Sequence, residues 1–312
     1  MKTSFSAPAK VILSGEHAVV YGKPAFVSAV QLYLTCTVDK ASAEIKDDKF
    51  RHITDAVREY LRSHKISFAD EPASIRISSA IPVGRGLGSS AALSVAAVAA
   101  LLTYYAPDEK FTQDTINSLA YKVEKMFHKN PSGVDNSAAT FGGLLYYRKE
   151  FEFLKCISAL TFKIPPAIEQ NLYLIDTGKP KESTADMVNH VGTRYNQDTA
   201  HIEELMNKIE KTTRRMVVAI IKEDPIFFNT CISDNHDLLM ELGVVSPKAV
   251  AIINDLKPYG VGKITGAGGI KNGSGFILFS CVDKKEFEQV LNQKNLKFIK
   301  FKQDYTGFKA NQ

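Results

Sequence analysis

The stretch Pro82-Val-Gly-Arg-Gly-Leu-Gly-Ser-Ser90 lies between a predicted strand, Ala73–Ile81, and a predicted alanine-rich helix, Ser89–Tyr105. Its glycines permit positive φ angles and let a ligand approach the backbone closely. The start of the helix offers free N–H groups and the positive end of the helix dipole, which together favour an anion such as phosphate. The stretch is neither a Walker loop nor a dinucleotide fingerprint, because no Lys-Ser or Lys-Thr closes it and the GxGxxG spacing fails. A glycine-rich turn with a serine N-cap is the alternative interpretation.

A carboxylate is predicted inside the apolar face of the next helix. The helix expected at Thr112–Lys129 has apolar residues at helical spacing, and Glu124 falls among them. A carboxylate in that position is costly unless it is paired or bound to a cation. Asp135 follows the predicted turn Asn130–Gly133 and could simply cap the next element. Two carboxylates near a phosphate loop would suit a metal ligand and a general base.

A second glycine-rich stretch, Thr265-Gly-Ala-Gly-Gly269, follows Lys263 in the second half of the chain. It is either a hairpin turn or a second backbone cradle that faces the first stretch. Near the N-terminus, Lys10 and the triplet Gly15-Glu16-His17 lie on or beside a predicted strand. Spacing alone does not assign a role to Lys10, Glu16 or His17.

The composition of the chain limits the classes of protein to which it can belong. The chain has 312 residues, of which 45% are hydrophobic and 23% charged, so it is long enough for about two folded domains and is not disordered, collagen-like or coiled-coil. The net charge of +5 is mild, and the lysines of Lys294–Lys302 are interpreted as guards of an edge strand and not as a nucleic-acid surface. The longest apolar run, Ala91–Tyr105, falls short of the roughly 20 residues that a membrane span needs.

The cysteines and the N-terminus indicate a soluble protein of the reducing cytosol. No signal peptide opens the chain, because Met1–Lys10 is polar and soon reaches a proline. The cysteines form no CxxC pair, so we expect small core hydrophobes and neither disulfides nor a zinc site; they are Cys36, Cys156, Cys231 and Cys281.

The order of predicted elements favours an α+β protein of two domains, because strands and helices mix without strict βαβ alternation. The second half begins after Pro165 and Pro166 with a strand at Leu172–Asp176. Helical signal follows at Ser183–Lys222 and Ile226–Leu242, and after Pro247, before strands at Gly275–Cys281 and Phe298–Phe301. Because glycine-rich turns lie in both halves, we expect a site in the cleft between the two domains.

Three segments in order resemble the motifs of the superfamily of galactokinase, homoserine kinase, mevalonate kinase and phosphomevalonate kinase, abbreviated GHMP. They are Ser6-Ala-Pro-Ala-Lys-Val-Ile-Leu-Ser-Gly-Glu-His17, Gly86-Leu-Gly-Ser-Ser-Ala91 and Lys263-Ile-Thr-Gly-Ala-Gly-Gly269. Two further segments resemble the mevalonate kinase branch: Gly15-Glu-His-Ala-Val-Val-Tyr-Gly22 and Asn130-Pro-Ser-Gly-Val-Asp135. The resemblance spans almost the whole chain.

The resemblance implies roles for individual residues. Asp135 matches the general base and Lys10 the lysine that stabilises developing negative charge, while Ser90 and Glu124 match the Mg²⁺ ligands. Glu16, His17 and Thr184 match residues of the substrate pocket. The ATP-binding positions are Gly84, Arg85, Gly86, Leu87, Gly88, Ser89, Ser90 and Ala91 of the first glycine stretch, with Gly266 and Gly268 of the second.

The implied protein is an ATP- and Mg²⁺-dependent kinase that phosphorylates the 5-hydroxyl of mevalonate. Its implied fold joins an ATP-binding domain similar to domain 2 of ribosomal protein S5, residues 1–165, to a ferredoxin-like domain, residues 166–312. A homodimer is the family expectation, with no nucleic-acid or membrane partner. Two other interpretations stay open: a sibling such as phosphomevalonate kinase, which needs a second anion pocket, and a silent ligand sensor, which the presence of Lys10 and Asp135 disfavours.

The chain departs from the implied pattern at three places. Ala9 and Lys129 stand where the family has glycine, and Ile270-Lys-Asn-Gly-Ser-Gly275 interrupts the third motif. A looser loop there could alter ATP affinity. Lys271 within it could reach a phosphate or simply face solvent.

Overall fold

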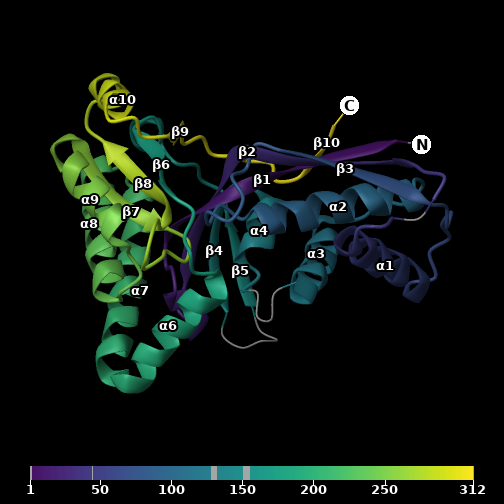
Figure 1. The fold of residues 1–312 in the computed structure, drawn as a ribbon, viewed down its shortest axis with the longest axis horizontal. Helices are drawn as coiled ribbons and strands as arrows, with labels where there is room; N and C mark the ends of the chain where they lie inside the picture. The colour runs from purple at the N-terminus through teal and green to yellow at the C-terminus, as the bar shows by residue number, and fades with distance from the viewer. Residues whose placement is uncertain (1, 44, 128–131, 150–154, 312) are drawn as a thin grey trace.

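Two antiparallel sheets organise the chain in the computed structural model, which describes residues 2–43, 45–127, 132–149 and 155–311 (Figure 1). The first sheet has the order β10-β1-β2-β4-β5, and β3 pairs with the far part of β2. Its long strands are β1, Thr3–Ser14, and β2, Ala25–Lys40. The others are β3, Ala73–Ser79; β4, Leu144–Lys149; β5, Lys155–Leu160; and β10, Lys309–Ala310.

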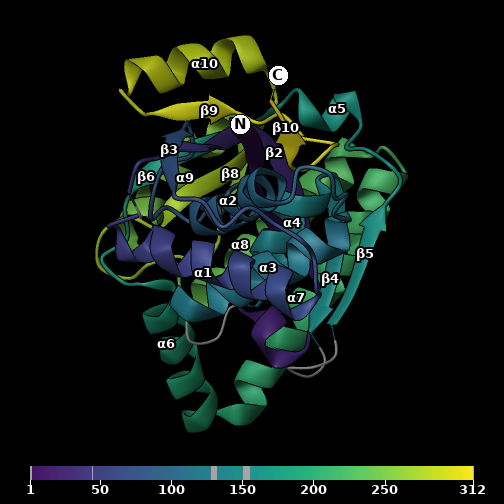
Figure 2. The same cartoon turned by 90° about the vertical axis from the view of Figure 1, so that its right-hand side faces the viewer.

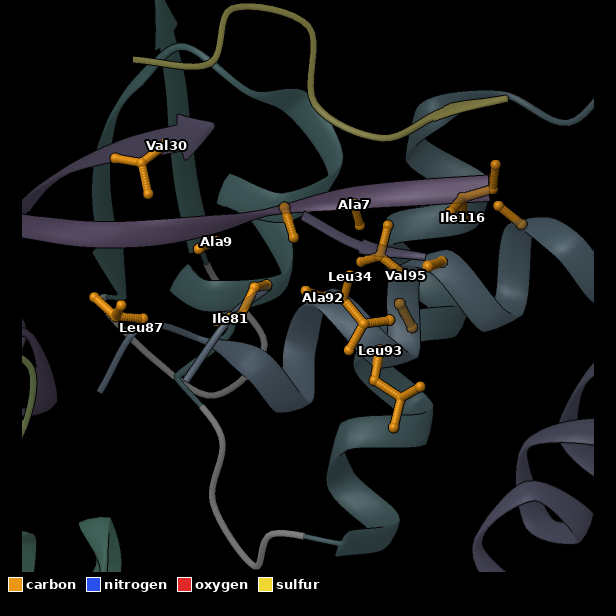
Figure 3. Packing of buried hydrophobic residues seen from close by; sticks show 14 of the residues in the cluster. Ala7, Ala9, Val30, Leu34, Ile81, Leu87, Ala92, Leu93, Val95 and Ile116 are labelled. Carbon is orange, nitrogen blue, oxygen red and sulfur yellow. The ribbon is translucent and has the colours of Figure 1, made fainter. Parts of the chain in front are cut away.

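Four helices pack on one face of the first sheet, and Figures 1 and 2 agree on this arrangement. They are α1, Asp48–Ser63; α2, Ser89–Tyr105; α3, Gln113–Phe127; and α4, Val134–Phe141. The central helix α2 is buried along most of its length, because its alanines let it lie close to β1 and β2. Figure 3 shows Ala92 and Val95 of α2 beneath β1, beside Ala7 and Leu34.

The second sheet has the order β7-β8-β6-β9, and all its pairs are antiparallel. Its strands are β6, Leu172–Gly178; β7, Gly260–Thr265; β8, Gly275–Cys281; and β9, Phe298–Lys300. The helices of this half are α5, Pro166–Glu169; α6, Thr184–Gln197; α7, Thr199–Ile221; α8, Pro225–Glu241; α9, Pro247–Leu256; and α10, Lys284–Gln293. Short 3₁₀ helices occupy Ala18–Tyr21 and Lys257–Tyr259.

Several predicted elements have different limits in the structure. The helical region predicted at Ser183–Lys222 is two helices, because Asp198 leaves the helical conformation and caps α7 by accepting a hydrogen bond from the amide of His201. The helix α1 begins after Asp47, which caps it by accepting hydrogen bonds from two amides. Strand β7 was not predicted, and it ends at Thr265, where the second glycine stretch begins.

Only part of the region predicted around the turn after α3 lies within the described residues. The last two residues of the predicted helix Thr112–Lys129 and the first two of the turn Asn130–Gly133 lie outside the described residues. Strands β4 and β5 form an antiparallel pair on either side of residues 150–154, which likewise lie outside the described residues. The lysine-rich segment contains β9, which is an edge strand of the second sheet, as predicted.

Three cysteines are buried, as expected, but Cys156 is exposed. The prediction was wrong there because β5 is an edge strand, and alternation along it turns Cys156 outward. Among the described residues, no helix combines the length and the apolar character that crossing a membrane requires.

One of the hydrophobic clusters spans both halves of the chain, and a second one lies almost entirely in the second half. A single buried cluster joins residues of α2 to Leu174 of β6, Phe228 of α8 and Leu278 of β8. The end of the chain also returns to the first sheet, where β10 pairs with β1 so that Ala310 lies opposite Phe5. The site described next lies where β1, α2 and β7 approach one another.

Candidate active site

The first glycine stretch forms a tight turn that leads into α2. Gly84, Gly86 and Gly88 have φ angles of 70°, 84° and 75°, in the left-handed region that glycine tolerates best. Gly88 is the N-cap of α2 and has no side chain to bind the first amides. The alternative of a serine N-cap is therefore wrong: Ser89 and Ser90 are the first helical residues. The start of α2 keeps its backbone donors for an anion.

Lys10 and Asp135 meet beside this turn. Lys10 Nζ lies 3.2 Å from Asp135 Oδ1, with the lysine on β1 and the aspartate in the first turn of α4. The backbone amide of Lys10 donates to the carbonyl of Leu87 at 3.0 Å, which ties β1 to the glycine turn. A Cβ at Gly88 would lie 2.9 Å from Lys10 Cγ and 3.7 Å from Asp135 Oδ2. The residue pair predicted from sequence is thus assembled, and only glycine fits against it.

Ser90 and Glu124 form a second polar pair on the same side of the turn. The Ser90 hydroxyl donates to Glu124 Oε1 at 2.9 Å, and the buried Ser94 hydroxyl donates to the same oxygen at 2.6 Å. Glu124 lies on the apolar face of α3, as its spacing predicts, and is almost fully buried. Ser94 was not singled out from the sequence, although it lies one helical turn after Ser90. The side-chain atoms that meet at this place are all oxygens.

The second glycine stretch faces the first. A Cβ built on Gly266 would lie 3.2 Å from the Cα of Gly86, and one on Gly86 would lie 3.2 Å from the carbonyl oxygen of Thr265. The two backbones therefore meet with no room for side chains between them. Both interpretations of Thr265–Gly269 hold, because the stretch begins the connection between the antiparallel strands β7 and β8 and its backbone also faces the first stretch.

A cavity of about 400 Å³ lies between the glycine stretches and the segment that leads into α6. Its lining includes five predicted positions, Gly84, Arg85, Gly86, Thr184 and Gly268, and two basic residues that no sequence motif indicated, Lys179 and Lys181. Its full lining is Gly84, Arg85, Gly86, Lys179, Pro180, Lys181, Glu182, Ser183, Thr184, Thr265, Ala267, Gly268 and Ser274. The basic side chains and glycines of this lining are of the kind that suits an anionic ligand.

Three of the predicted ATP-binding residues have side chains that are either buried or already paired within the protein. Arg85 forms an ion pair with Asp176 at the end of β6. The side chains of Leu87 and Ala91 are buried. Leu87 and Ala91 can therefore face a ligand only through their backbone.

Glu16 and His17 are buried under the second glycine stretch and do not line the cavity. Glu16 forms an ion pair with Lys263, and both side chains are completely buried. Burial raises the pKa of Glu16, although the Lys263 charge opposes this, and burial lowers the pKa of Lys263. His17 Nε2 donates to the carbonyl of Ala267 at 2.9 Å, and burial lowers the pKa of His17 to about 4.

The residues that interrupt the third motif fold back onto the second sheet. The amide of Ser274 donates to Thr177 Oγ1 at 2.8 Å, and a Cβ on Gly273 would lie 2.3 Å from the carbonyl oxygen of Gly178. The segment is therefore packed and not a loose loop at this end. Lys271 is exposed and is not among the residues that line the cavity.

Comparison with known proteins identifies the family. Residues 51–143 match the family model described as "GHMP kinases N terminal domain". The chain is 33% identical over 300 residues to a mevalonate kinase of Pyrococcus abyssi, covering 85% of each chain. The mevalonate kinase structure from Methanococcus jannaschii matches with a TM-score of 0.77 at 24% identity over 96% of this chain and 98% of the other. The L. major mevalonate kinase, solved in complex with R-mevalonate, matches with a TM-score of 0.75 at 24% identity over 93% and 90%. The chain therefore belongs to the mevalonate kinase family, within the GHMP kinases.

Proposed function

We propose that this kinase transfers the γ-phosphoryl group of ATP to the 5-hydroxyl of mevalonate, with Mg²⁺. The observation that carries the proposal is the Lys10–Asp135 pair, which lies against the glycine turn at the start of α2. Two further findings support the proposal. Mevalonate kinases match most of this chain, and one structural neighbour was solved with R-mevalonate bound.

Asp135 is the proposed general base. Its side chain is 41% exposed, so a hydroxyl can approach the carboxylate from solvent. The hydroxyl proton passes to Asp135 while the oxygen forms a bond to the γ-phosphorus and the bond from that phosphorus to the ADP oxygen breaks. Lys10, held 3.2 Å away, stabilises the negative charge that develops on the attacking oxygen.

The phosphates of ATP are proposed to lie in the cavity that the two glycine stretches form with the segment leading into α6. The uncapped amides of α2 provide donors and the positive end of the dipole for them. Gly266 and Gly268 extend this cradle from the other side, and Lys179 and Lys181 of the cavity supply positive charge. In phosphoryl transfer such positioning and neutralisation supply most of the catalysis.

Mg²⁺ is proposed to bind at Ser90 and Glu124. Their oxygens are already 2.9 Å apart, and a hydroxyl with a carboxylate is a donor set that fits this hard cation. The described residues contain no cluster of three or more His, Cys, Asp or Glu side chains, so phosphate oxygens and water would complete the coordination. When bound, the ion would neutralise phosphate charge.

We assign residues 1–165 to the S5-like ATP-binding domain and residues 166–312 to the ferredoxin-like domain, with the active site in the cleft between them. The strand order β9-β6-β8-β7 and the chain order strand, helices, two strands, helix, strand support the second assignment. The division has one exception, because β10 lies in the first sheet. Thr184, at the start of α6, is the proposed substrate contact that lines the cavity.

The test is ADP release from ATP and Mg²⁺ with mevalonate, phosphomevalonate, homoserine and galactose in parallel, with each product weighed by mass spectrometry. We expect turnover with mevalonate alone and a product heavier by one phosphoryl group. Turnover with a different acceptor would retain the Lys10–Asp135 chemistry and overturn the substrate. The absence of turnover with all four acceptors, while ATP still binds, would overturn the proposed activity.

A further inference from the structure

A buried polar contact joins the two sheets directly behind the proposed active site. It consists of Ile12 on β1, Glu16 just after it, and Lys263 and Thr265 on β7, and is called here the β1–β7 seam. Lys263 and Thr265 are two residues apart on β7, so their side chains share one face of that strand. The strands β1 and β7 belong to different sheets, so these side chains, and not a strand ladder, connect them.

Both β7 side chains hold the backbone of Ile12. The Thr265 hydroxyl accepts a hydrogen bond from the Ile12 amide at 2.9 Å and donates one to the Ile12 carbonyl at 3.0 Å. Lys263 Nζ donates to the same carbonyl at 3.3 Å and pairs with Glu16 Oε1. The pairing of β1 with β2 has a register shift between Ile12 and Ser14, next to the backbone that the β7 side chains contact.

The seam lies between the two parts that must be aligned for transfer. Two residues before Ile12 is Lys10, which holds Asp135. Directly after Thr265 is Gly266, whose backbone packs on Gly86. A shift of β7 along β1 would therefore move the second glycine stretch relative to the Lys10–Asp135 pair.

Stability alone does not explain the charged pair. Glu16 and Lys263 are completely buried, and Glu16 Oε2 has no hydrogen-bond partner in the described part of the chain. A buried ion pair loses the hydration of both charges, and well-packed apolar residues in its place are often as stable or more stable. Directional contacts of this kind can instead specify one arrangement of two elements.

We propose that Glu16, Lys263 and Thr265 are positioning residues, which fix the position of β7 on β1 and thereby align the nucleotide cradle with Lys10 and Asp135. Glu16 then acts through Lys263 and not on the substrate. The proposal rests on the proposed function, because it assigns the cradle to ATP.

The test compares two double variants of the full chain. Glu16→Gln with Lys263→Met removes both seam charges together. Arg215→Met with Asp234→Asn removes a partly exposed ion pair of 2.6 Å between α7 and α8, and so controls for the loss of one positive and one negative charge. We expect the seam variant to fold, to bind a non-hydrolysable ATP analogue within about threefold of wild type and to lose about 100-fold in kcat, because misalignment of about 1 Å costs this much. The control variant keeps wild-type kcat. A folded seam variant with wild-type kcat overturns the proposal.

A second pair of variants decides the matter if the seam variant does not fold. Thr265→Val removes the hydroxyl that holds Ile12, and Thr265→Ser keeps it. We expect faster amide hydrogen exchange in peptides covering 8–14 in the valine variant alone, with exchange in α8 unchanged. Equal exchange in both variants overturns the proposal. This readout needs no acceptor, so it separates failure of the positioning role from failure of the proposed activity, which wild-type turnover tests.

Discussion

Lys10 and Asp135 approach to 3.2 Å from opposite environments: the lysine side chain is 5% exposed and the aspartate side chain 41% exposed. The ammonium is held from inside by β1 and the glycine turn, while the carboxylate opens to solvent. An acceptor can therefore reach the aspartate without displacing the lysine. The next two predictions separate the roles of these residues.

Asp135→Asn should reduce kcat by about 10²–10⁴-fold, because an amide cannot take the hydroxyl proton. Its oxygen can still accept a hydrogen bond from Lys10, so affinity for an ATP analogue should not change. Steady-state kinetics and calorimetry measure the two quantities. Asp114→Asn, at an exposed position in the first turn of α3, is the control and should keep wild-type turnover. Turnover of Asp135→Asn within a few fold of wild type would refute the base assignment.

Lys10→Met should reduce kcat by about 10²–10³-fold and change the acceptor KM much less, because the lysine contact strengthens as charge develops in the transition state. The exposed Lys271→Met is the matched control and should keep both constants. A change confined to KM would mean that Lys10 only binds substrate. A loss of ATP affinity with Lys271→Met would mean that this lysine reaches a phosphate after all.

Glu124→Gln should raise the Mg²⁺ concentration for half-maximal activity by at least about tenfold, because an amide is a weaker ligand than a carboxylate for a hard cation. The amide still bonds with the Ser90 and Ser94 hydroxyls, so the fold should persist. The measurement is a Mg²⁺ titration at fixed ATP, with the exposed Glu109→Gln as control. An unchanged midpoint for Glu124→Gln would exclude it as a metal ligand.

Gly86→Ala should raise the KM for ATP, and Gly143→Ala should not. Both glycines have positive φ, 84° and 65°, so each alanine should lower the free energy of unfolding by about 1–2 kcal/mol. A Cβ at Gly143 meets nothing within 4 Å, whereas one at Gly86 lies 3.2 Å from the Thr265 carbonyl oxygen. Urea unfolding and ATP titration measure the two effects. Equal KM values in both variants would show that the contact between the glycine stretches is irrelevant to ATP.

His17 should make the fold less stable as the pH falls from 6.5 to 4. Burial lowers its pKa to about 4 from the usual 6.5, so in this window the unfolded chain binds a proton that the folded chain does not. The stabilisation is complete above pH 6.5 and lost on acidification, by up to about 3 kcal/mol. The neighbouring His190 charge acts in the same direction, and burial also lowers the pKa of His236.

The measurement for His17 is the free energy of unfolding at pH 7.5 and pH 5. Wild type should lose more stability between the two than His17→Gln, which cannot titrate. His64→Gln, at the exposed end of α1, should lose as much as wild type. Equal losses in wild type and His17→Gln would contradict the shift.

The features of the site that could be predicted from the sequence are those that residue spacing within one segment determines. Helical period places Glu124 on the buried face of α3, and the alternating glycines at 84, 86 and 88 indicate positive φ by residue type alone. The facing of the two glycine stretches was one of two open interpretations, since nothing local to Thr265–Gly269 shows what lies across from it.

The features that could not be predicted depend on contacts between residues far apart in the sequence. Glu16 was assigned to the substrate pocket by resemblance, and its partner Lys263 lies 247 residues away. Lys179 and Lys181 reach the cavity only because β6 ends beside the glycine turn, where Arg85 meets Asp176. Such contacts depend on the packing of two sheets, which the spacing of residues within one segment does not encode.

The pairing of β10 with β1 has a consequence for synthesis on the ribosome. Ser6 and Asn311 are joined by a hydrogen bond of 3.0 Å across 305 residues of chain. The part of the β1 edge at Phe5 and Ser6 therefore stays uncovered until residue 310 has been translated. During that interval an exposed strand edge is open to pairing with other chains, so a nascent chain stalled before residue 309 should be prone to aggregation even though the proposed catalytic residues have already been made.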